Sequence, residues 1–355
     1  MAAKIVSIVG ARPNFIKAFS VSREIRKEFK EVIVHTGQHY DYLMNKVFFD
    51  ELGMPEVDYH LGVGSGSHAY QTGEMLKRIE EVLINENPDL VLVYGDTNTT
   101  LAGALAASKL HIKIAHIEAG LRSFDKSMPE EINRILTDHC SDYLFCPTQT
   151  AVNNLKNESI VENVFMTGDV MVDALKSCIN IIDEENILSK IDVTPGDYYL
   201  ATIHRAENTD NIERLSNILR AFKELGNIVF PVHPRTKGAL ENIPLSRDII
   251  NGIKIIEPVG YLDMLALEKN AKKIITDSGG VQKEAYILGI PCITIRNNTE
   301  WVETLEEGWN ILVEAETEKI FEVVSKFNPT KQRSNLFGNG EASKRIKEIL
   351  TDIYH

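Results

Sequence analysis

A chain of 355 residues is longer than one hydrophobic core usually supports, so its length predicts two domains. Apolar residues make up 43% of the chain and charged residues 25%, which is the balance of an ordinary globular protein. The net charge of −13 argues against nucleic acid as a general partner, because a phosphate backbone would be repelled, but it allows a small anionic ligand that meets only its local pocket.

The cysteines and the N-terminus bear on where the protein works. The four cysteines show neither a CxxC pair nor the spacing of a metal site: Cys140, Cys146, Cys178 and Cys292. Scattered thiols are typical of reduced, intracellular proteins. The N-terminal residues lead directly into an apolar strand pattern, and no apolar run approaches the length of a membrane span. We therefore expect a cytoplasmic protein with no membrane partner and no nucleic-acid partner.

Short, continuous apolar runs recur through the first half of the chain and predict a parallel sheet covered by helices on both faces. These runs occupy residues 4–9, 31–35, 90–94, 112–117, 142–147 and 163–169. Helical periodicity lies between them, at residues 42–52, 68–86 and 98–109, and a further helical pattern runs from 170 to about 187. The alternation predicts a doubly wound α/β domain.

The turn after the first strand carries two cations. Arg12 and Lys17 flank the start of the following helix, where free N–H groups and the helix dipole also attract negative charge. Isolated basic residues usually only solvate a helix surface, but their place at a strand end favours an anion site. The glycine-rich segment at residues 62–67 follows no convincing strand, so we expect a mobile loop there rather than a phosphate-binding loop.

The stretch at residues 89–134 is the centre of the functional prediction. Its two strand patterns each end in acid: Asp96 follows the first and Glu118 the second, and Glu130 and Glu131 arrive after a loop. Because the carboxyl ends of parallel strands meet at one edge of a sheet, we expect these carboxyls to share one crevice. Crowded carboxyls raise one another's pKa, which can provide a general acid and a general base at neutral pH.

The alternative for each of these acids is a helix cap. Asp96 stands just before the helical pattern at 98–109, where an aspartate commonly caps a helix N-terminus. Capping is the better explanation for any one of these acids taken alone and the poorer one for all of them together.

The second half repeats the plan of the first. Its apolar runs occupy residues 197–205, 227–235, 253–258, 272–277 and 290–295, and helical patterns follow at about 316–326 and 341–354. The sequence therefore predicts two Rossmann-like halves, each presenting the ends of its strands.

The turn at residues 277–280 is the sharpest binding signal. Gly279 and Gly280 allow backbone to approach a ligand closely, and the helix that follows Ser278 offers free N–H groups to a phosphate. Glu284 lies one helical turn further on, where a carboxylate accepts hydrogen bonds from the vicinal hydroxyls of a ribose. A plain glycine turn is the rival explanation.

His204 and His233 each close a strand of the second half. We expect at least one of them to face the ligand, where a cation would stabilise a leaving diphosphate. Their spacing does not support a metal site, so no metal is expected. No GxGxxG motif follows the first strand and no P-loop lysine is present, so nicotinamide or ATP chemistry has little support and no cofactor is expected.

Eight motifs taken together resemble one family. They are GARPNFIK (10–17), TGQH (36–39), GDTNTT (95–100), HIEAGLRS (116–123), PEEINR (129–134), HRAEN (204–208), TDSGGVQKEA (276–285) and GNGEASKRI (338–346). Their order along nearly the whole chain resembles that of the non-hydrolysing UDP-N-acetylglucosamine 2-epimerases. The resemblance implies a GT-B architecture of two Rossmann-like domains facing across a cleft. It also implies an isomerase that interconverts UDP-N-acetylglucosamine and UDP-N-acetylmannosamine by eliminating UDP to a 2-acetamidoglucal and adding it back, without a metal or redox cofactor.

The resemblance also implies roles for individual residues. Catalytic positions correspond to Asp96, Glu118, Glu130, His204 and Arg134. Nucleotide-binding positions correspond to Arg12, Lys17, His204, Ser278, Gly279, Gly280 and Glu284, and we add Arg296 beyond the last predicted strand. An effector site would correspond to Gln38, His39 and His233. Met264 and Trp301 depart from the family pattern around the nucleobase, where an aromatic residue and an arginine, respectively, are common.

The expected domains are residues 1–168, with a C-terminal helix at 341–355 packing back on them, and a UDP-binding domain at 169–340. We expect a homodimer that supplies N-acetylmannosamine-type sugars for surface polysaccharide or glycan synthesis. Alternatives are a GT-B glycosyltransferase, a hydrolysing epimerase that releases N-acetylmannosamine and UDP, a relative acting on acetamido-uronic acid nucleotides, and a nucleotide-sugar binding module without activity.

Overall fold

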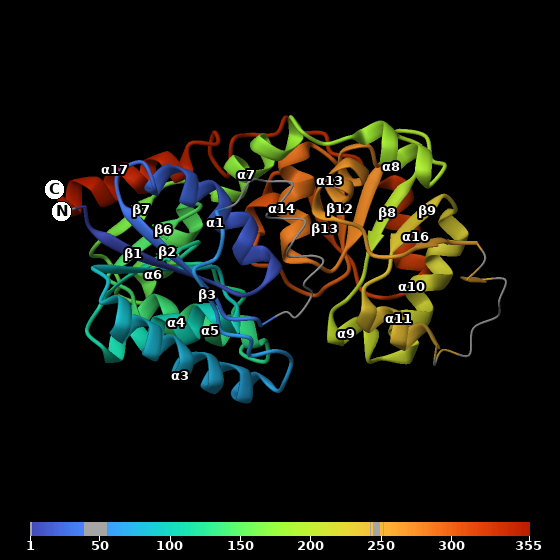
Figure 1. Ribbon diagram of the computed structural model, residues 1–355. Coiled ribbons are helices and arrows are strands. Elements are labelled where there is room, and N and C mark those ends of the chain that lie inside the picture. Colours follow the sequence, from blue (N-terminus) through green and yellow to red (C-terminus); the bar gives the residue numbers. More distant parts are fainter. Residues whose placement is uncertain (1, 39–54, 242, 244–248, 251) are drawn as a thin grey trace. The chain divides into compact units, whose positions relative to one another are not determined.

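The computed structural model describes residues 2–38, 55–241, 243, 249–250 and 252–355. The chain folds into two compact units (Figure 1). Unit 1 consists of Met1–Ser177 and Asn335–His355, and unit 2 consists of Cys178–Ser334. Each unit contains one parallel sheet, so the prediction of two Rossmann-like α/β domains, the components of a GT-B fold, is confirmed.

The sheet of unit 1 has the strand order β3-β2-β1-β4-β5-β6-β7, and all its pairings are parallel. Its strands are β1 (Lys4–Val9), β2 (Lys30–His35), β3 (Tyr59–His60), β4 (Leu90–Tyr94), β5 (Lys113–Ile117), β6 (Tyr143–Cys146) and β7 (Val164–Met166). Every residue of β4 is buried, as expected for a central strand covered on both faces.

The helices of unit 1 cover both faces of this sheet. They are α1 (Arg12–Ile25), α3 (His68–Glu86), α4 (Asn98–Lys109), α5 (Pro129–Cys140), α6 (Gln149–Asn157), α7 (Val170–Ile179) and α17 (Ala342–Tyr354). Helices α3, α4 and α5 lie on one face, and α1 and α17 lie on the other (Figure 1). The apolar side chains of β1, β2 and β4 pack with those of α3 and α4 in one core cluster.

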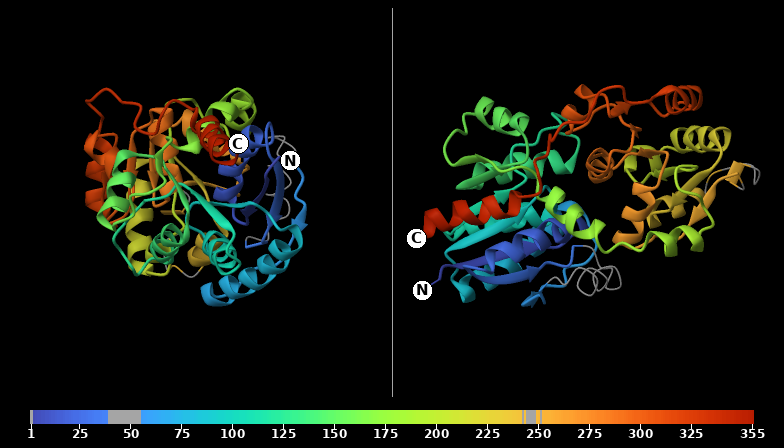
Figure 2. Two further views of the ribbon diagram at one scale, coloured as in Figure 1. Left: turned by 90° about the vertical axis from the view of Figure 1, so that its left-hand side faces the viewer. Right: turned by 90° about the horizontal axis from the view of Figure 1, so that it is seen from above.

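The last helix belongs to unit 1. In α17, Lys347 Nζ lies 2.8 Å from Glu28 Oε1, and Thr351 Oγ1 donates to the same carboxylate at 2.7 Å. Tyr354 Oη donates to the Asp89 carbonyl at 3.1 Å, while the backbone N–H of Lys4 donates to the Asp89 carboxylate at 2.7 Å. The two ends of the chain therefore lie close together on unit 1 (Figure 2).

The sheet of unit 2 has the order β10-β9-β8-β11-β12-β13 and is also parallel. Its strands are β8 (Tyr199–Thr202), β9 (Ile228–Pro231), β10 (Lys254–Ile256), β11 (Lys273–Thr276), β12 (Cys292–Thr294) and β13 (Asn310–Leu312). Its helices are α8 (Glu184–Lys190), α9 (Ala206–Thr209), α10 (Ile212–Leu225), α11 (Pro234–Glu241), α13 (Tyr261–Lys269), α14 (Gly279–Leu288), α15 (Val302–Glu306) and α16 (Thr317–Lys326).

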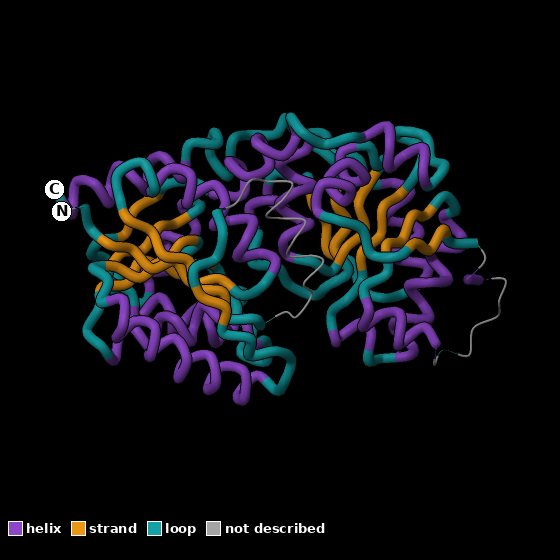
Figure 3. Tube along the Cα trace, in the orientation of Figure 1, coloured by secondary structure: helices purple, strands orange, loops and turns teal. Residues whose placement is uncertain are grey.

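Helices also cover both faces of the second sheet (Figure 3). One core cluster joins the sheet to α10 and α16, and a second cluster joins it to α8, α13 and α14. No helix in the described part of the chain combines the length and the apolar character that a membrane crossing requires.

Several details differ from the sequence predictions. Two short strands, β3 and β13, were not predicted. The glycine-rich segment at 62–67 does follow a strand, since β3 ends at His60. The helical pattern predicted from 170 to about 187 is two helices, α7 and α8. The helix predicted at residues 42–52 lies outside the described residues.

The boundaries of the two units also lie away from the expected positions after 168 and 340. Contacts with the end of the chain keep α7 in unit 1: the Asp169 N–H donates to the Phe337 carbonyl, and Lys176 Nζ donates to the Asn339 carbonyl. The Asp173 carboxylate accepts from the backbone N–H groups that begin α17, those of Ala342 and Ser343. These hydrogen bonds place the divisions at Ser177 and Ser334.

Candidate active site

The strand order of unit 1 reverses direction at β1 and β4. In doubly wound sheets the loops after such neighbouring strands diverge, and ligands bind in the crevice that they leave at the carboxyl edge. The segment after β1 leads into α1, which carries Arg12 and Lys17. The segment after β4 carries Asp96. The topology of unit 1 therefore brings the predicted cations and the first predicted acid to one edge of its sheet.

Asp96 is held by α5. Arg134 Nη2 donates to Asp96 Oδ2 at 2.5 Å, and Asn133 Nδ2 donates to the Asp96 carbonyl at 2.9 Å. The Arg134 side chain is 3% exposed, and its Nη1 donates to Glu131 Oε2 at 3.0 Å. One guanidinium thus joins two carboxylates, which is the fork geometry that arginine provides and lysine does not.

Asp96 does not cap α4. The N-cap residue is Thr97, whose hydroxyl accepts from the Thr100 N–H in a capping box. Thr97 Oγ1 also donates to Asn14 Oδ1 at 3.2 Å, and Asn14 Nδ2 donates to the Tyr94 carbonyl at 2.7 Å. The capping alternative is therefore wrong for Asp96, which leaves its carboxylate for Arg134.

Glu118 forms a buried ion pair. Its Oε2 lies 2.7 Å from Lys17 Nζ, and both side chains are 7% exposed. The backbone of Glu118 has φ 74°, a left-handed conformation that is unfavourable for a residue with a side chain. Such strained positions concentrate at functional sites, where the surrounding structure enforces them.

The adjacent acids Glu130 and Glu131 have different surroundings. Glu131 is buried and accepts hydrogen bonds from Ser123 N, Ser123 Oγ and Phe124 N at 2.8 to 2.9 Å, so it anchors the 121–124 loop. Glu130 is only partly buried and makes no hydrogen bond or ion pair with any described residue. Of the two, Glu130 is the carboxylate available to a ligand.

The expected crowding of like charges is not what the structure shows for the two strand-end acids. Asp96 contacts Arg134 and Glu118 contacts Lys17, so each acid has a cation beside it. The sequence could not show this arrangement, because the ion pairs depend on where α1 and α5 pack. The side chain of Arg12 lies outside the described structure, and its backbone begins α1.

The strand order of unit 2 reverses at β8 and β11, and the residues after these strands contact each other. His204 Nδ1 lies 3.0 Å from Asp277 Oδ1, and the His204 ring is 38% exposed while Asp277 is buried. Burial raises the pKa of Asp277, but hydrogen bonds from His204, Asn208 and the Arg205 backbone outweigh burial and hold this pKa below its usual value. The Asp277 carboxylate thus orients His204 with one ring edge toward solvent.

Ser278 and the two glycines begin α14. The Ser278 hydroxyl is the N-cap acceptor for the Val281 N–H. A Cβ on Gly279 would lie 2.1 Å from Glu300 Oε1, so a side chain at this position would require the Glu300 carboxylate to move. A Cβ on Gly280 would have no protein atom nearer than Ser278 Oγ at 3.9 Å, so nothing in the protein itself requires glycine there. The N-terminus of α14 is open at Gly280, as an anion-binding helix end would be.

Arg296 and Glu284 lie at the same end of unit 2. Arg296 Nη1 donates to Glu300 Oε2 at 3.0 Å, which places Arg296 behind the glycine turn. Glu284 Oε1 accepts from Tyr261 Oη at 3.0 Å. Burial, followed by the charge of Glu284, raises the pKa of Tyr261 well above its usual value, so Tyr261 remains a donor.

The two residues that depart from the family pattern are both buried. Met264 is 8% exposed and packs in a core cluster of unit 2. Trp301 is 2% exposed, and Lys283 Nζ lies 4.3 Å above its ring centroid. This distance is that of a cation–π contact.

The predicted effector residues are distributed over both units. In unit 1, Gln38 Oε1 accepts from Thr99 N and Thr99 Oγ1 at 3.0 and 2.8 Å. His39 lies outside the described residues. In unit 2, the rings of His233 and His204 lie 5.7 Å apart, so His233 belongs to the strand-end group around His204.

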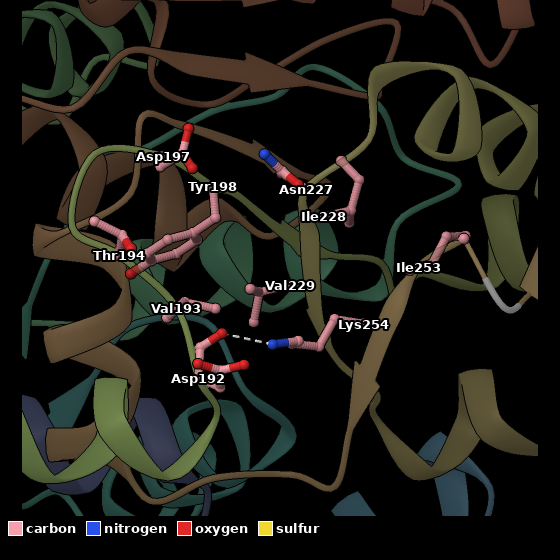
Figure 4. A pocket seen from close by; sticks show the side chains of 11 residues that line it. Asp192, Val193, Thr194, Asp197, Tyr198, Asn227, Ile228, Val229, Ile253 and Lys254 are labelled. Carbon is pink, nitrogen blue, oxygen red and sulfur yellow. Dashed lines mark hydrogen bonds between the residues drawn. The ribbon is translucent and has the colours of Figure 1, made fainter.

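A cavity of about 400 Å³ opens at the opposite edge of the second sheet (Figure 4). Its lining includes Tyr198 and Asn227, which precede β8 and β9, and Lys254, which begins β10. Lys254 Nζ donates to the Asp192 carbonyl at 2.7 Å within it. The cavity therefore lies at the amino ends of these strands and is distinct from the group around Ser278.

Sequence reasoning did not select several residues that the structure places beside the candidate site. They are His116, Arg122, Asn133 and Asp138 in unit 1, and Asn208 in unit 2. Most of them lie within the quoted motifs, but their importance comes from partners far away in the sequence.

The chain is similar to known proteins over almost its whole length. A family model described as UDP-N-acetylglucosamine 2-epimerase matches residues 23–351. A Methanococcus maripaludis protein named UDP-N-acetylglucosamine 2-epimerase homolog is 60% identical, with 99% of this chain and 100% of the relative covered. A Pseudomonas aeruginosa UDP-2,3-diacetamido-2,3-dideoxy-D-glucuronate 2-epimerase is 48% identical, with 99% of this chain and 100% of that protein covered.

A solved structure shows the same similarity. The crystal structure of Methanocaldococcus jannaschii UDP-GlcNAc 2-epimerase in complex with UDP-GlcNAc and UDP has a TM-score of 0.90 and 49% identity, and the match covers 98% of this chain and 99% of that one. The chain belongs to the UDP-N-acetylglucosamine 2-epimerase family.

Proposed function

We propose that this protein interconverts UDP-N-acetylglucosamine and UDP-N-acetylmannosamine by elimination and re-addition of UDP. The observation that carries the proposal is the set of acids at the strand ends of unit 1. Asp96 and Glu118 each form an ion pair with a cation. Glu130, in the first turn of α5, has no hydrogen-bond or ion-pair partner among the described residues. Binding a nucleotide sugar does not require three such acids together, whereas removing a carbon-bound proton and returning one requires a positioned base and a positioned acid.

In the first step a carboxylate removes the proton from carbon 2 of the sugar. The bond between carbon 1 and the diphosphate oxygen breaks, and UDP leaves with the electron pair. The products are 2-acetamidoglucal and UDP. A proton is then returned to the opposite face of carbon 2, and the diphosphate oxygen adds back to carbon 1. Atoms and electrons balance without an oxidant or reductant.

Unit 2 supplies groups suited to the leaving UDP. His204, oriented by Asp277, and the free N–H groups at the start of α14 favour the negative charge that develops on the diphosphate. The Glu284 carboxylate is suited to the ribose hydroxyls, and we assign Arg12, Lys17 and Arg296 as further anion-binding or supporting cations. Gln38, His39 and His233 remain candidates for an effector site, and a homodimer remains our expectation for the assembly.

The identity of the sugar has a second candidate. A relative that is 48% identical over the full chain is named for a diacetamido glucuronate nucleotide. The same elimination chemistry would act on that substrate, because the acetamido group and the proton at carbon 2 are shared. The test therefore includes both nucleotide sugars.

The test is reaction in heavy water followed by NMR of the products. Each nucleotide sugar is incubated alone, without an acceptor. Elimination and re-addition should place deuterium at carbon 2 of the epimerised sugar while it remains attached to UDP. Free N-acetylmannosamine and UDP would indicate a hydrolysing enzyme, and turnover only after an acceptor is added would indicate a glycosyltransferase. A requirement for NAD would refute the elimination route.

Variants connect the reaction to the proposed residues. Asp96→Asn, Glu118→Gln and Glu130→Gln should each lower turnover by about 100- to 10,000-fold, the usual contribution of a positioned acid or base, while UDP still binds. Glu81→Gln on α3 is the matched control, because Glu81 is exposed. A Glu130→Gln enzyme with the turnover of the control would remove Glu130 from the mechanism.

A further inference from the structure

A buried hydrogen-bonded chain lies behind the acids of unit 1. At its centre is Asp138 of α5, which is 1% exposed. Asp138 Oδ2 accepts from Arg122 Nη1 at 2.7 Å and from the Gly120 N–H at 3.1 Å. Asp138 Oδ1 lies 2.7 Å from Nδ1 of His116, a residue of β5. Burial raises the pKa of Asp138, but the charges and hydrogen bonds of His116 and Arg122 outweigh burial and hold this pKa below its usual value.

The second nitrogen of His116 also faces an acceptor. Its Nε2 lies 2.7 Å from the Gly95 carbonyl oxygen, and the residue is 0% exposed. A carbonyl and an ionised carboxylate can only accept hydrogen bonds. A neutral imidazole would place a nitrogen lone pair against one of these oxygens at hydrogen-bonding distance. Both acceptors receive a hydrogen bond from this ring only when each nitrogen carries a proton, as in an imidazolium.

The charges around His116 balance when it is protonated. Arg122 pairs with Asp138 and also makes two hydrogen bonds of 2.7 Å to the Glu158 carboxylate. Two carboxylates then face two cations, Arg122 and His116, in a region where an unpaired charge would be costly. Burial, followed by the charge of Asp138, raises the pKa of the Cys146 thiol in β6, so this thiol stays neutral.

This series of hydrogen bonds, from Asp138 through His116 to Gly95, ends next to the proposed catalytic acid Asp96. Gly95 is bonded to Asp96, and the Gly95 N–H donates to the Ile117 carbonyl at 2.9 Å. The His116 ring therefore fixes the peptide group that precedes Asp96. Through Asp138 the same ring is tied to α5, the helix that supplies Arg134 to the Asp96 carboxylate. The backbone and the side chain of Asp96 are therefore both held in place by contacts that lead to α5.

We propose that His116 is a positioning residue of the epimerase: a buried imidazolium, held by Asp138, that fixes the Gly95 peptide group and thereby the Asp96 carboxylate. This inference rests on the proposed function of Asp96. His116 does not act on the substrate itself, since no part of its ring is exposed.

The first test is spectroscopic and uses the wild-type protein. In protein labelled with ¹⁵N-histidine, one imidazole should show two N–H groups at neutral pH, with both protons exchanging slowly because the ring is buried. His116→Gln should remove this signal set and no other. If the buried ring instead shows one nitrogen without a proton, the inference is overturned. The result does not depend on activity, so it stands apart from any failure of the proposed function.

The second test is kinetic. In His116→Gln the amide nitrogen can take the place of only one of the two ring nitrogens, so one acceptor loses its donor. We expect kcat to fall by about 100-fold, the cost of a small misplacement of a reacting group. UDP affinity and KM should change less than about threefold, because the nucleotide groups of unit 2 are untouched. Asp138→Asn, which keeps the shape and the Oδ1 acceptor but removes the charge, should show the same division between kcat and KM.

The control is His139→Gln. His139 also lies beside this network, with Nε2 3.2 Å from Glu158 Oε2, but its side chain is 48% exposed. Within the described part of the chain it forms no hydrogen bond with Asp138 or Gly95. Its replacement should leave kcat unchanged. A folded His116→Gln or Asp138→Asn enzyme with wild-type kcat would refute the positioning role. Wild-type protein that epimerises neither nucleotide sugar would refute the proposed function. The NMR experiment would then be the remaining test of the protonation of His116.

Discussion

Lys17 Nζ and Glu118 Oε2 are 2.7 Å apart, and water has almost no access to either side chain. The pair joins α1 to the strained turn after β5, where Glu118 has a positive φ angle. Removing one member of a buried ion pair leaves the other charge buried without a counterion, which is costly. Lys17 therefore contributes to both the stability and the geometry of unit 1.

Replacing Lys17 by methionine should destabilise unit 1 by about 3 to 5 kcal/mol, because the Glu118 carboxylate stays buried after its cation is removed. Both tryptophans, Trp301 and Trp309, lie in unit 2, so their fluorescence does not report this loss. Hydrogen exchange of the β4 amides, which lie in the centre of the first sheet, measures it directly.

The matched control for Lys17 is Lys27→Met. Lys27 pairs with Glu24 at 2.7 Å, but its side chain is 59% exposed, so we expect a loss below about 1 kcal/mol. The double variant Lys17→Met/Glu118→Gln should recover part of the loss seen for Lys17→Met. Equal effects of the Lys17 and Lys27 replacements would contradict the importance of the buried pair.

Gly279→Ala and Gly280→Ala should separate folding from ligand binding. A methyl group on Gly279 would collide with Glu300, so the first variant should lower the thermal stability of unit 2. A methyl group on Gly280 would come no nearer than 3.9 Å to a protein atom, Ser278 Oγ, so the second variant should keep its stability and lose UDP affinity if phosphate approaches this helix end. Thermal unfolding by tryptophan fluorescence and calorimetric titration with UDP measure the two effects. Undiminished UDP affinity in Gly280→Ala would place the diphosphate elsewhere.

Tyr261→Phe should weaken UDP binding through Glu284. The variant removes the hydroxyl that donates to Glu284 Oε1, and a hydrogen bond to a charged group is worth about 1.5 to 3 kcal/mol. Without this donor the carboxylate is less well oriented toward the ribose. Tyr198→Phe is the control, because the buried Tyr198 hydroxyl donates only to the Leu267 carbonyl. Titration calorimetry should show reduced affinity for the first variant and wild-type affinity for the second.

His35 should make unit 1 sensitive to mild acid. Burial and the nearby His60 lower the pKa of His35 from 6.5 to about 4. Between these values the unfolded chain binds a proton that the folded protein does not, so stability falls as pH falls from about 6.5 to 4 and is unaffected by this group above 6.5.

In His35→Phe this loss should disappear. Phenylalanine keeps the stacked contact with Phe15, whose ring centroid lies 4.9 Å from that of His35, and it does not titrate. Relative to wild type, the variant should gain up to about 3 kcal/mol of stability by pH 4, as the pKa difference implies. Hydrogen exchange of β1 and β2 amides at several pH values measures the difference. Parallel stability curves for the two proteins would show that His35 does not carry this pH dependence.

The strands and the helices between them could be predicted because their signals are local. Residues 90–94 are apolar without interruption, and they form β4, which is buried throughout. The helical period at 68–86 coincides with α3. Side-chain burial repeats with the geometry of each element, so a short window of sequence carries the information. The strand β13 was not predicted.

The chemistry of the site depended on tertiary structure. Sequence reasoning selected Asp96 and Glu118 from their places after strands, but it predicted mutual crowding, whereas the structure pairs Asp96 with Arg134 and Glu118 with Lys17. The protonation that we propose for His116 rests on its contacts with Asp138 and Gly95, which are 22 and 21 residues away from it. The order of strands in the sheet decides which distant segments become neighbours, and electrostatic interactions depend on those distances. Residue order along the chain identified the acids, and the packing of α1 and α5 against the sheet decided their partners.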